Sequence, residues 1–164
     1  MDFLDISLIF SILSCSLVTG FIFTYAIVVL PGFSKLDDKE YIRAFQVTDE
    51  VIQNNQPLFM LTWIGSIISV LGAILASILS PDLGETWFIV LIGVVYLLGV
   101  QGITITIHLP INNHIKDLNL DELDNQTLIK ERLKLETKWN YFNNIRTGAG
   151  LFVIMSLLLV LTVR

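Results

Sequence analysis

The sequence predicts an all-α fold: a four-helix transmembrane bundle with an amphipathic cytoplasmic helix that extends into the fourth span. Of its 164 residues, 54% are hydrophobic and only 15% are charged, whereas soluble domains are about a quarter charged. The charges avoid four stretches, each close to the roughly 20 residues that a spanning helix needs: Ile6–Leu30, Pro57–Leu79, Thr86–Ile107 and Thr147–Val163. We expect one transmembrane domain over residues 1–164, with spans at about 6–30, 57–79, 86–107 and 145–163.

Prolines mark the expected ends of these spans. Pro31 is expected to end the first one, because proline cannot continue the hydrogen-bond ladder of a helix. Pro57 suits the first turn of the second span, and Pro81 is expected to close it. The third span opens near Trp87 and ends at Pro110. The first segment lacks the basic start of a signal peptide and is too long for one, so we interpret it as a retained helix.

The distribution of basic residues predicts the orientation. Of the ten lysines and arginines, only Arg164 lies outside the two long connections, which follow the first and third spans. Such connections stay on the cytoplasmic side. We therefore place both of them in the cytoplasm and both termini outside, in an integral protein of the bacterial inner (plasma) membrane. The net charge of −5 argues against a nucleic-acid partner, since phosphate binding needs a basic surface.

Both long connections have helical character. Residues 35–55 place apolar residues among charges, and Asp49 and Glu50 are interpreted there as part of a solvated helix face. In residues 121–145 an apolar face recurs at helical spacing: Leu128, Leu135, Trp139 and Phe142. No proline separates this segment from the fourth span. We expect either one long helix or a break near Asn143–Asn144.

Small residues predict how the first two spans pack. Helices in lipid approach closely where small side chains recur every four residues. Two such stripes are present: Ser7, Ser11, Cys15 and Thr19, and Gly65, Ser69, Ala73 and Ser77. Cys15 is the single cysteine, so it cannot form an intramolecular disulfide.

Polar side chains converge at the edge of the membrane that we place in the cytoplasm. His108 closes the third span, and Asn112 follows it. An imidazole there is a candidate proton carrier, metal or haem ligand, or donor to a carbonyl group. Trp139, Phe142, Asn143 and Arg146 share one face of the last helix. Arg146 is costly in this position unless it meets an acceptor or a ligand anion, or extends to water as an interfacial anchor.

Four short motifs resemble the DUF1772 or anthrone oxygenase-like family in order and spacing. They are Leu30-Pro31-Gly32, Pro57-Leu58-Phe59, Pro110-Ile111-Asn112, and the set Trp139, Asn143, Ile145, Arg146 and Thr147. The chain departs from the family pattern at Gln56 and His108, where asparagine is usual, and at Phe142, where tryptophan is usual. The resemblance implies an oxygenase or oxidoreductase, because fungal members resemble enzymes that convert an anthrone to an anthraquinone.

The resulting hypothesis is oxidation of a flat aromatic or quinol-like substrate that partitions into the bilayer. The candidate catalytic residues are His108 as the base and Arg146 as the partner of the substrate anion. For substrate binding, Asn112 and Asn143 would orient the oxygens, and Trp139 and Phe142 would stack on the rings.

The sequence leaves open whether the chain is an enzyme. One alternative is a non-enzymatic protein that binds lipid or another hydrophobe, or an accessory subunit. Another is a four-helix membrane protein that holds haem or copper through His108. We assign no metal site and leave the cofactor unknown, with none, haem and copper all open. The expected partners are membrane lipids and a hydrophobic small molecule, no nucleic acid is expected, and a homo-oligomer stays open.

Overall fold

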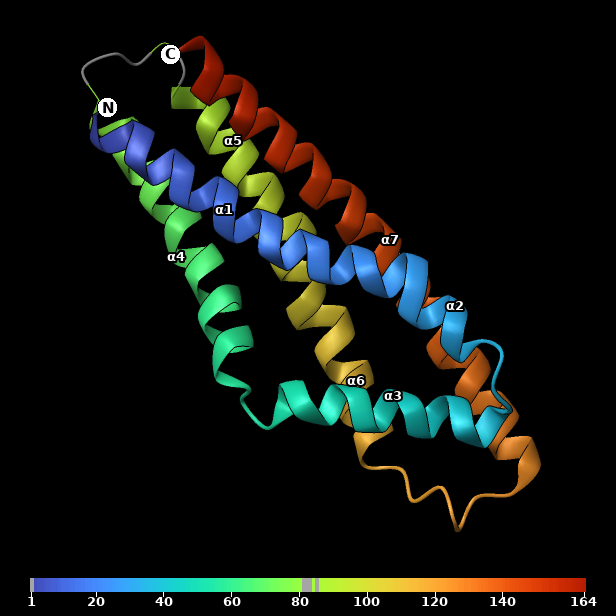
Figure 1. Ribbon diagram of the computed structural model, residues 1–164. Coiled ribbons are helices and arrows are strands. Elements are labelled where there is room, and N and C mark those ends of the chain that lie inside the picture. Colours follow the sequence, from blue (N-terminus) through green and yellow to red (C-terminus); the bar gives the residue numbers. More distant parts are fainter. Residues whose placement is uncertain (1, 81–83, 85) are drawn as a thin grey trace.

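The computed structural model describes residues 2–80, 84 and 86–164, which form an elongated bundle of helices (Figure 1). In chain order the helices are α1 (Phe3–Thr24), α2 (Leu30–Phe33), α3 (Asp38–Gln53), α4 (Pro57–Ile78), α5 (Thr86–Tyr96), α6 (Leu109–Lys116) and α7 (Asn125–Val163). Wider π-helical turns join some of these helices into longer rods: η1 (Tyr25–Val29), η2 (Leu97–Gly102) and η3 (Thr104–His108).

Four rods are long and apolar enough to cross a membrane, which confirms the predicted fold class. They are Phe3–Phe33, Pro57–Ile78, Thr86–Lys116 and Asn125–Val163. Large apolar side chains on their outer faces, such as Leu13, Leu61 and Leu159, are more than half exposed. A surface covered by such side chains is suited to lipid rather than to water.

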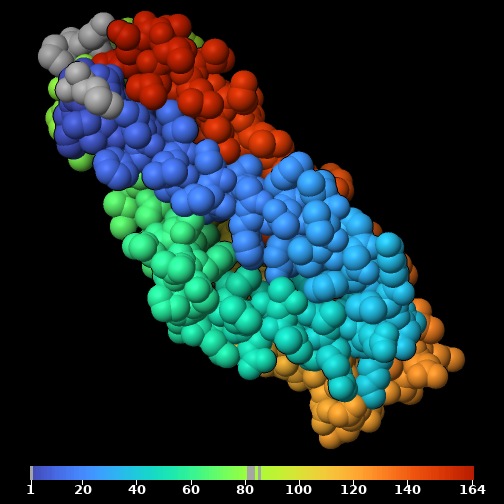
Figure 2. Space-filling view, in the orientation of Figure 1, coloured from blue at the N-terminus to red at the C-terminus, as the bar shows by residue number. Residues whose placement is uncertain are grey.

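The four rods form a bundle that α3 crosses at one end. α1 packs on α4 and α7, and α5 packs on the same two helices. Both termini lie at the end remote from α3 (Figure 1). Figure 2 shows the face made by α1, α3 and α4, which is hollowed between α1 and α4 close to α3.

Local sequence explains where the helices begin. Asp2, Asp37 and Asp124 precede α1, α3 and α7, and each carboxylate accepts a hydrogen bond from the backbone N–H three residues further on. These bonds satisfy donors that the first turn of a helix leaves free. Pro57 occupies the first position of α4 as predicted, where its missing N–H removes no helical bond.

Two of the predicted helix ends are wrong. The chain stays helical past Pro31 to Phe33 and past Pro110 to Lys116. The reason is local: η1 and η3 directly precede α2 and α6, and Pro31 and Pro110 are the second residues of these helices. In a regular α-helix the proline ring would clash with a preceding carbonyl group, and the π turn changes the backbone spacing at that point. The expected helix end at Pro81 lies outside the described residues, and α4 ends at Ile78.

The long second connection is continuous with the fourth span. α7 runs unbroken from Asn125 to Val163, so the alternative of a break near Asn143–Asn144 is not realised. This continuity fixes the rotation of the membrane part of α7 to that of its polar part. A close approach to α1 adds to this constraint, because a Cβ atom on Gly150 would lie 2.9 Å from Cγ2 of Thr19.

The stripes of small residues meet, with a shift on α4. Ser11, Cys15 and Thr19 are buried on α1, and the Ser11 hydroxyl donates to the Ser69 carbonyl at 2.8 Å. On α4 Ala73 and Ser77 of the predicted stripe are buried, whereas Ser66 and Val70 are buried in place of Gly65 and Ser69. Gly65 faces open space.

Two apolar clusters form the core. One fills the bundle and includes Leu8, Tyr96 and Val153. The other lies beneath α3 and includes Phe45 and Trp139. Residues of both clusters line a cavity, which therefore lies where the clusters adjoin.

Candidate functional site

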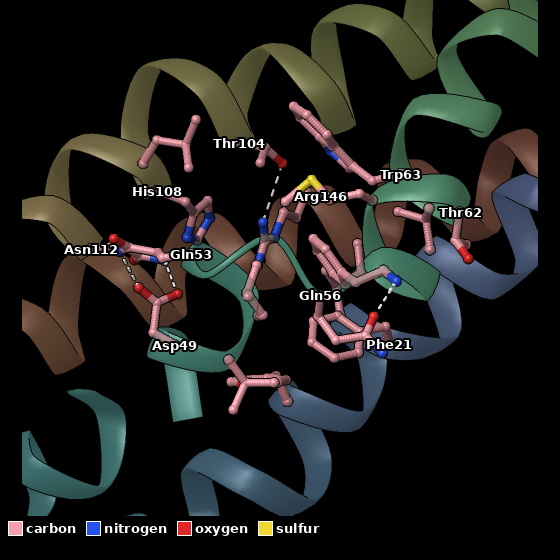
Figure 3. A pocket seen from close by; sticks show the side chains of 18 of the residues that line it. Phe21, Asp49, Gln53, Gln56, Thr62, Trp63, Thr104, His108, Asn112 and Arg146 are labelled. Carbon is pink, nitrogen blue, oxygen red and sulfur yellow. Dashed lines mark hydrogen bonds between the residues drawn. The ribbon is translucent and has the colours of Figure 1, made fainter. Parts of the chain in front are cut away.

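A cavity of about 830 Å³ opens beside α3 and reaches into the bundle. This volume lies within the range of cavities that bind drug-sized ligands. α1, α3, α4, η2, η3, α6 and α7 all contribute side chains to its wall. Its apolar wall includes Leu17, Phe21, Phe59, Trp63 and Val100, and its polar groups include Asp49, Thr104, His108, Asn112 and Arg146 (Figure 3).

Arg146 brings a positive charge into this cavity from α7. Its side chain is only 6% exposed. Nε donates to Oδ1 of Asn143 at 3.0 Å, and Nη1 donates to Oγ1 of Thr104 at 3.2 Å. Both partners are neutral, and within the described ranges no carboxylate lies within 4 Å of the guanidinium. A buried cation without a counter-ion is costly, so a ligand anion would be strongly favoured here.

His108 lies next to Arg146, at the end of η3. Its ring packs edge-on against Trp139 at a centroid distance of 4.6 Å, and the Arg146 guanidinium carbon lies 5.1 Å from the centroid of the same ring. The side chain is 2% exposed, and neither ring nitrogen has a hydrogen-bond partner in the described part of the chain. Because buried polar atoms are normally paired, the two unpaired nitrogens mark His108 as a group with unused hydrogen-bonding capacity beside the cavity.

A hydrogen-bonded network on the α3 side faces the same cavity. Oδ1 of Asp49 accepts from Nδ2 of Asn112 at 2.7 Å, and its Oδ2 accepts from Gln53. Oδ1 of Asn112 in turn accepts from Nε1 of Trp139 at 3.0 Å. The network links α3 to α6 and α7. It also fixes the position of the Trp139 indole, against which His108 and Arg146 pack.

The structure brings together most of the residues that the sequence singled out. His108, Asn112, Trp139 and Arg146 line the cavity. Asn143 lies behind Arg146: it accepts from Nε of Arg146 and donates from Nδ2 to the carbonyl of Ile22 at 3.1 Å. It therefore positions the guanidinium and does not line the cavity.

Phe142 does not occupy its expected place. It is not one of the cavity-lining residues. Its ring packs edge-on against Tyr141 at 5.2 Å, and Tyr141 is 62% exposed. The structure therefore does not group Phe142 with the other predicted site residues, and its stacking on a substrate stays a prediction.

Sequence reasoning missed Asp49. We interpreted it as part of a solvated face, yet it is 7% exposed and lies in the cavity wall. A signal was present: Tyr41, Phe45 and Asp49 follow one another at four-residue spacing, so Asp49 continues the buried face of α3. A carboxylate in that position replaces an apolar residue and points to a polar function.

The second histidine lies apart from the cavity wall. Nε2 of His114 lies 2.7 Å from Oε2 of Glu131, and its side chain is 45% exposed. Among the residues that the structure describes, no three His, Cys, Asp or Glu side chains are grouped to hold a metal ion.

Four long apolar rods surround a cavity that has a buried guanidinium and an imidazole in its wall, and this arrangement defines an integral membrane protein. Residues 55–156 match the family model described as anthrone oxygenase. The chain belongs to the anthrone oxygenase family. Comparison with curated proteins and with solved structures found no match. The matched segment contains His108, Asn112, Trp139 and Arg146, whereas α1 and Asp49 precede it.

Proposed function

We propose that this protein oxidises a flat, weakly acidic aromatic substrate of the anthrone or quinol type with dioxygen. The observation that carries the proposal concerns two buried side chains: among the described residues, Arg146 has no carboxylate partner, and the ring nitrogens of the neighbouring His108 have no hydrogen-bond partner. Family membership supports the same chemistry.

The cavity suits a flat hydrophobic molecule. Phe21 and Phe59 pack edge to face at a centroid distance of 5.2 Å, and Trp63 lies in the same wall. Aromatic walls of this kind favour stacked or edge-on contacts with a ligand ring. Two lining residues at the outer edge, Leu17 and Leu58, are 56% and 70% exposed, so the entrance between α1 and α4 is apolar and would admit a substrate directly from the bilayer.

The proposed chemistry uses two side chains, the imidazole of His108 and the guanidinium of Arg146. His108 accepts a proton from the CH₂ group of the anthrone, and the anion that remains carries its charge on the ring oxygen. Arg146 stabilises that oxyanion, and in a water-poor cavity the attraction is stronger than in water.

Dioxygen then accepts the electrons of the anion. A C–O bond forms at the deprotonated carbon, and the proton held by His108 completes a hydroperoxide on the substrate. Loss of water from this hydroperoxide leaves a carbonyl group. In sum, one anthrone and one dioxygen give one anthraquinone and one water, so both hydrogens of the CH₂ group leave in the water.

The test replaces Arg146 by glutamine in the full-length protein purified in detergent. Removing one donor to a developing oxyanion lowers turnover by about 100-fold or more, and the Arg146→Gln variant is expected to show such a loss in air-equilibrated buffer. Formation of the anthraquinone is followed by absorption. Lys138→Gln, an exposed change on the same helix, is expected to retain turnover. Unchanged turnover in Arg146→Gln would refute the assignment.

A second candidate function is non-enzymatic binding of a lipid or another hydrophobe. The apolar entrance favours this function, because it suits the apolar part of a lipid. Arg146 would then bind the anionic headgroup. Mass spectrometry of material that stays bound after purification separates the two: phospholipid alone supports the binding role, and a polyphenolic or quinone-like compound supports oxidation. An absorption spectrum of the same sample tests the haem or copper alternative at His108.

A further inference from the structure

Asp49 places a second buried charge in the cavity wall, opposite in sign to Arg146. It lies on α3, outside the segment that matches the family model. Within the described residues, no lysine or arginine lies within 4 Å of its carboxylate. The cavity is thus lined by one cation and one anion that are not paired with each other.

Neutral groups hold the two charges in place. Asn112 and Gln53 donate to Asp49, whereas Asn143 and Thr104 accept from Arg146. The chain of contacts from the carboxylate to the guanidinium passes through Asn112 and Trp139. Two buried opposite charges would ordinarily attract each other strongly in a medium of low dielectric constant. Their separation leaves each of them available to a ligand.

The Asp49 carboxylate still has capacity to accept hydrogen bonds. A carboxylate offers about four acceptor positions, and Gln53 and Asn112 use two. A group that can only accept discriminates sharply: it bonds a hydroxyl of the ligand, and it repels a carbonyl or ether oxygen in the same position.

We propose that Asp49 is a specificity-determining residue, whose carboxylate accepts a hydrogen bond from a hydroxyl group on the aromatic substrate, away from the oxygen bound by Arg146. The inference rests on the proposed function, because it assumes that the cavity binds the aromatic substrate. It adds a requirement that Arg146 and His108 do not impose, namely a hydrogen-bond donor on the substrate.

The test compares two probes that differ only in that donor. One is an anthrone with a single hydroxyl on the ring edge away from its carbonyl group, and the other is the matching methoxy compound. Binding is measured under argon, where the oxidation cannot proceed, through quenching of the tryptophan fluorescence, since Trp63 and Trp139 both line the cavity. Hydrogen bonds to charged groups are strong, so we expect the wild-type protein to bind the hydroxyl probe about tenfold or more tightly than the methoxy probe.

The variant Asp49→Asn is expected to lose this preference. Its affinity ratio should fall to about one or invert, while the affinity for the methoxy probe is maintained. Glu50→Gln, an exposed neighbour on α3, should keep the wild-type ratio. Equal losses for both probes in Asp49→Asn would assign Asp49 a structural role and overturn the inference.

The wild-type measurement alone also decides between the two proposals. Tight binding of both probes with equal affinity would overturn the role of Asp49 and leave the proposed function standing. If neither probe binds, the proposed function and this inference both fail.

Discussion

The carboxyl group of Asp49 is buried on α3, and this burial has an electrostatic cost. Desolvation raises its pKa above the ordinary value, and hydrogen bonds from Gln53 and Asn112 together with the charge of Lys116 offset part of the effect. The folded protein therefore holds a proton on Asp49 more tightly than the unfolded chain does. The stabilisation from that proton is fully present below the unfolded pKa and is lost as the pH rises through the folded pKa.

We predict that Asp49→Asn stabilises the protein at neutral pH. Asparagine has the same shape and no charge, so it avoids the cost of a buried carboxylate. The variant should have the higher unfolding temperature at pH 7, and the difference should shrink as the pH falls through the raised pKa of Asp49. Thermal unfolding in detergent over a pH series measures this. A lower unfolding temperature for the variant at pH 7 would contradict the prediction.

Together with a lost preference for the hydroxyl probe, the expected result would make Asp49 a residue kept for function at the expense of stability.

At the scale of the elements, the π turns are linked to the site. η1 contributes Tyr25 to the cavity wall, η2 contributes Val100, and η3 contributes Thr104 and His108. Such turns are often found at functional sites, because they alter which side chains share a helix face. Pro110 follows η3 closely, and its ring would clash with a carbonyl of a regular α-helix. Pro110 therefore disfavours a regular α-helix in place of η3, and the π turn accommodates the ring of Pro110.

We predict that Pro110→Ala separates stability from function. Alanine restores the missing N–H and lets η3 relax toward an α-helix, so the unfolding temperature should stay equal or rise. The relaxation rotates Thr104 and His108 relative to the cavity, and turnover should fall about tenfold, since small displacements of reacting groups are costly. Thermal unfolding and anthraquinone formation are measured on the same preparation.

Pro57→Ala serves as the control for this experiment. Pro57 begins α4, where proline causes no strain, so both properties should stay close to those of the wild type. Full activity in Pro110→Ala would show that the π turn does not position the site.

The same elements show which features the sequence could predict. Four uncharged stretches were sufficient for the spans, and convergence of the span ends was sufficient to group His108, Asn112 and Arg146. Hydropathy carries no signal for a π turn, so the continuation past Pro110 was missed. The four-residue spacing along α3 indicated that Asp49 shares a face with Tyr41 and Phe45, but spacing alone does not show what covers that face, and Asp49 was assigned to solvent. For Phe142, helical spacing placed it near Arg146, but its ring orientation depends on its contact with Tyr141.

At the scale of the whole molecule, the cavity lies toward the end of the bundle that α3 crosses. Polar lining residues such as Gln53 and Gln56 lie at that end, and apolar ones such as Leu17 and Trp63 lie deeper in the spans. Paired charges also gather there, including Lys39 with Asp121 at 2.8 Å and Arg132 with Asp38 at 3.0 Å. The polar part of the cavity lining thus lies toward the end of the bundle that α3 crosses, and the apolar part lies within the spans.

The charge distribution predicts that the α3 end faces the cytoplasm. Single cysteines test this, because the native Cys15 is buried and should not react. Asn119→Cys reports on the connection between α6 and α7, and Ser80→Cys reports on the end of α4 that is remote from α3. With a membrane-impermeant maleimide, Ser80→Cys should label in intact cells, and Asn119→Cys should label only after permeabilisation. The reverse pattern would place the site on the external side. Its substrate would then have to be available outside the cell, and the basic residues around α3 would need a role other than setting the orientation.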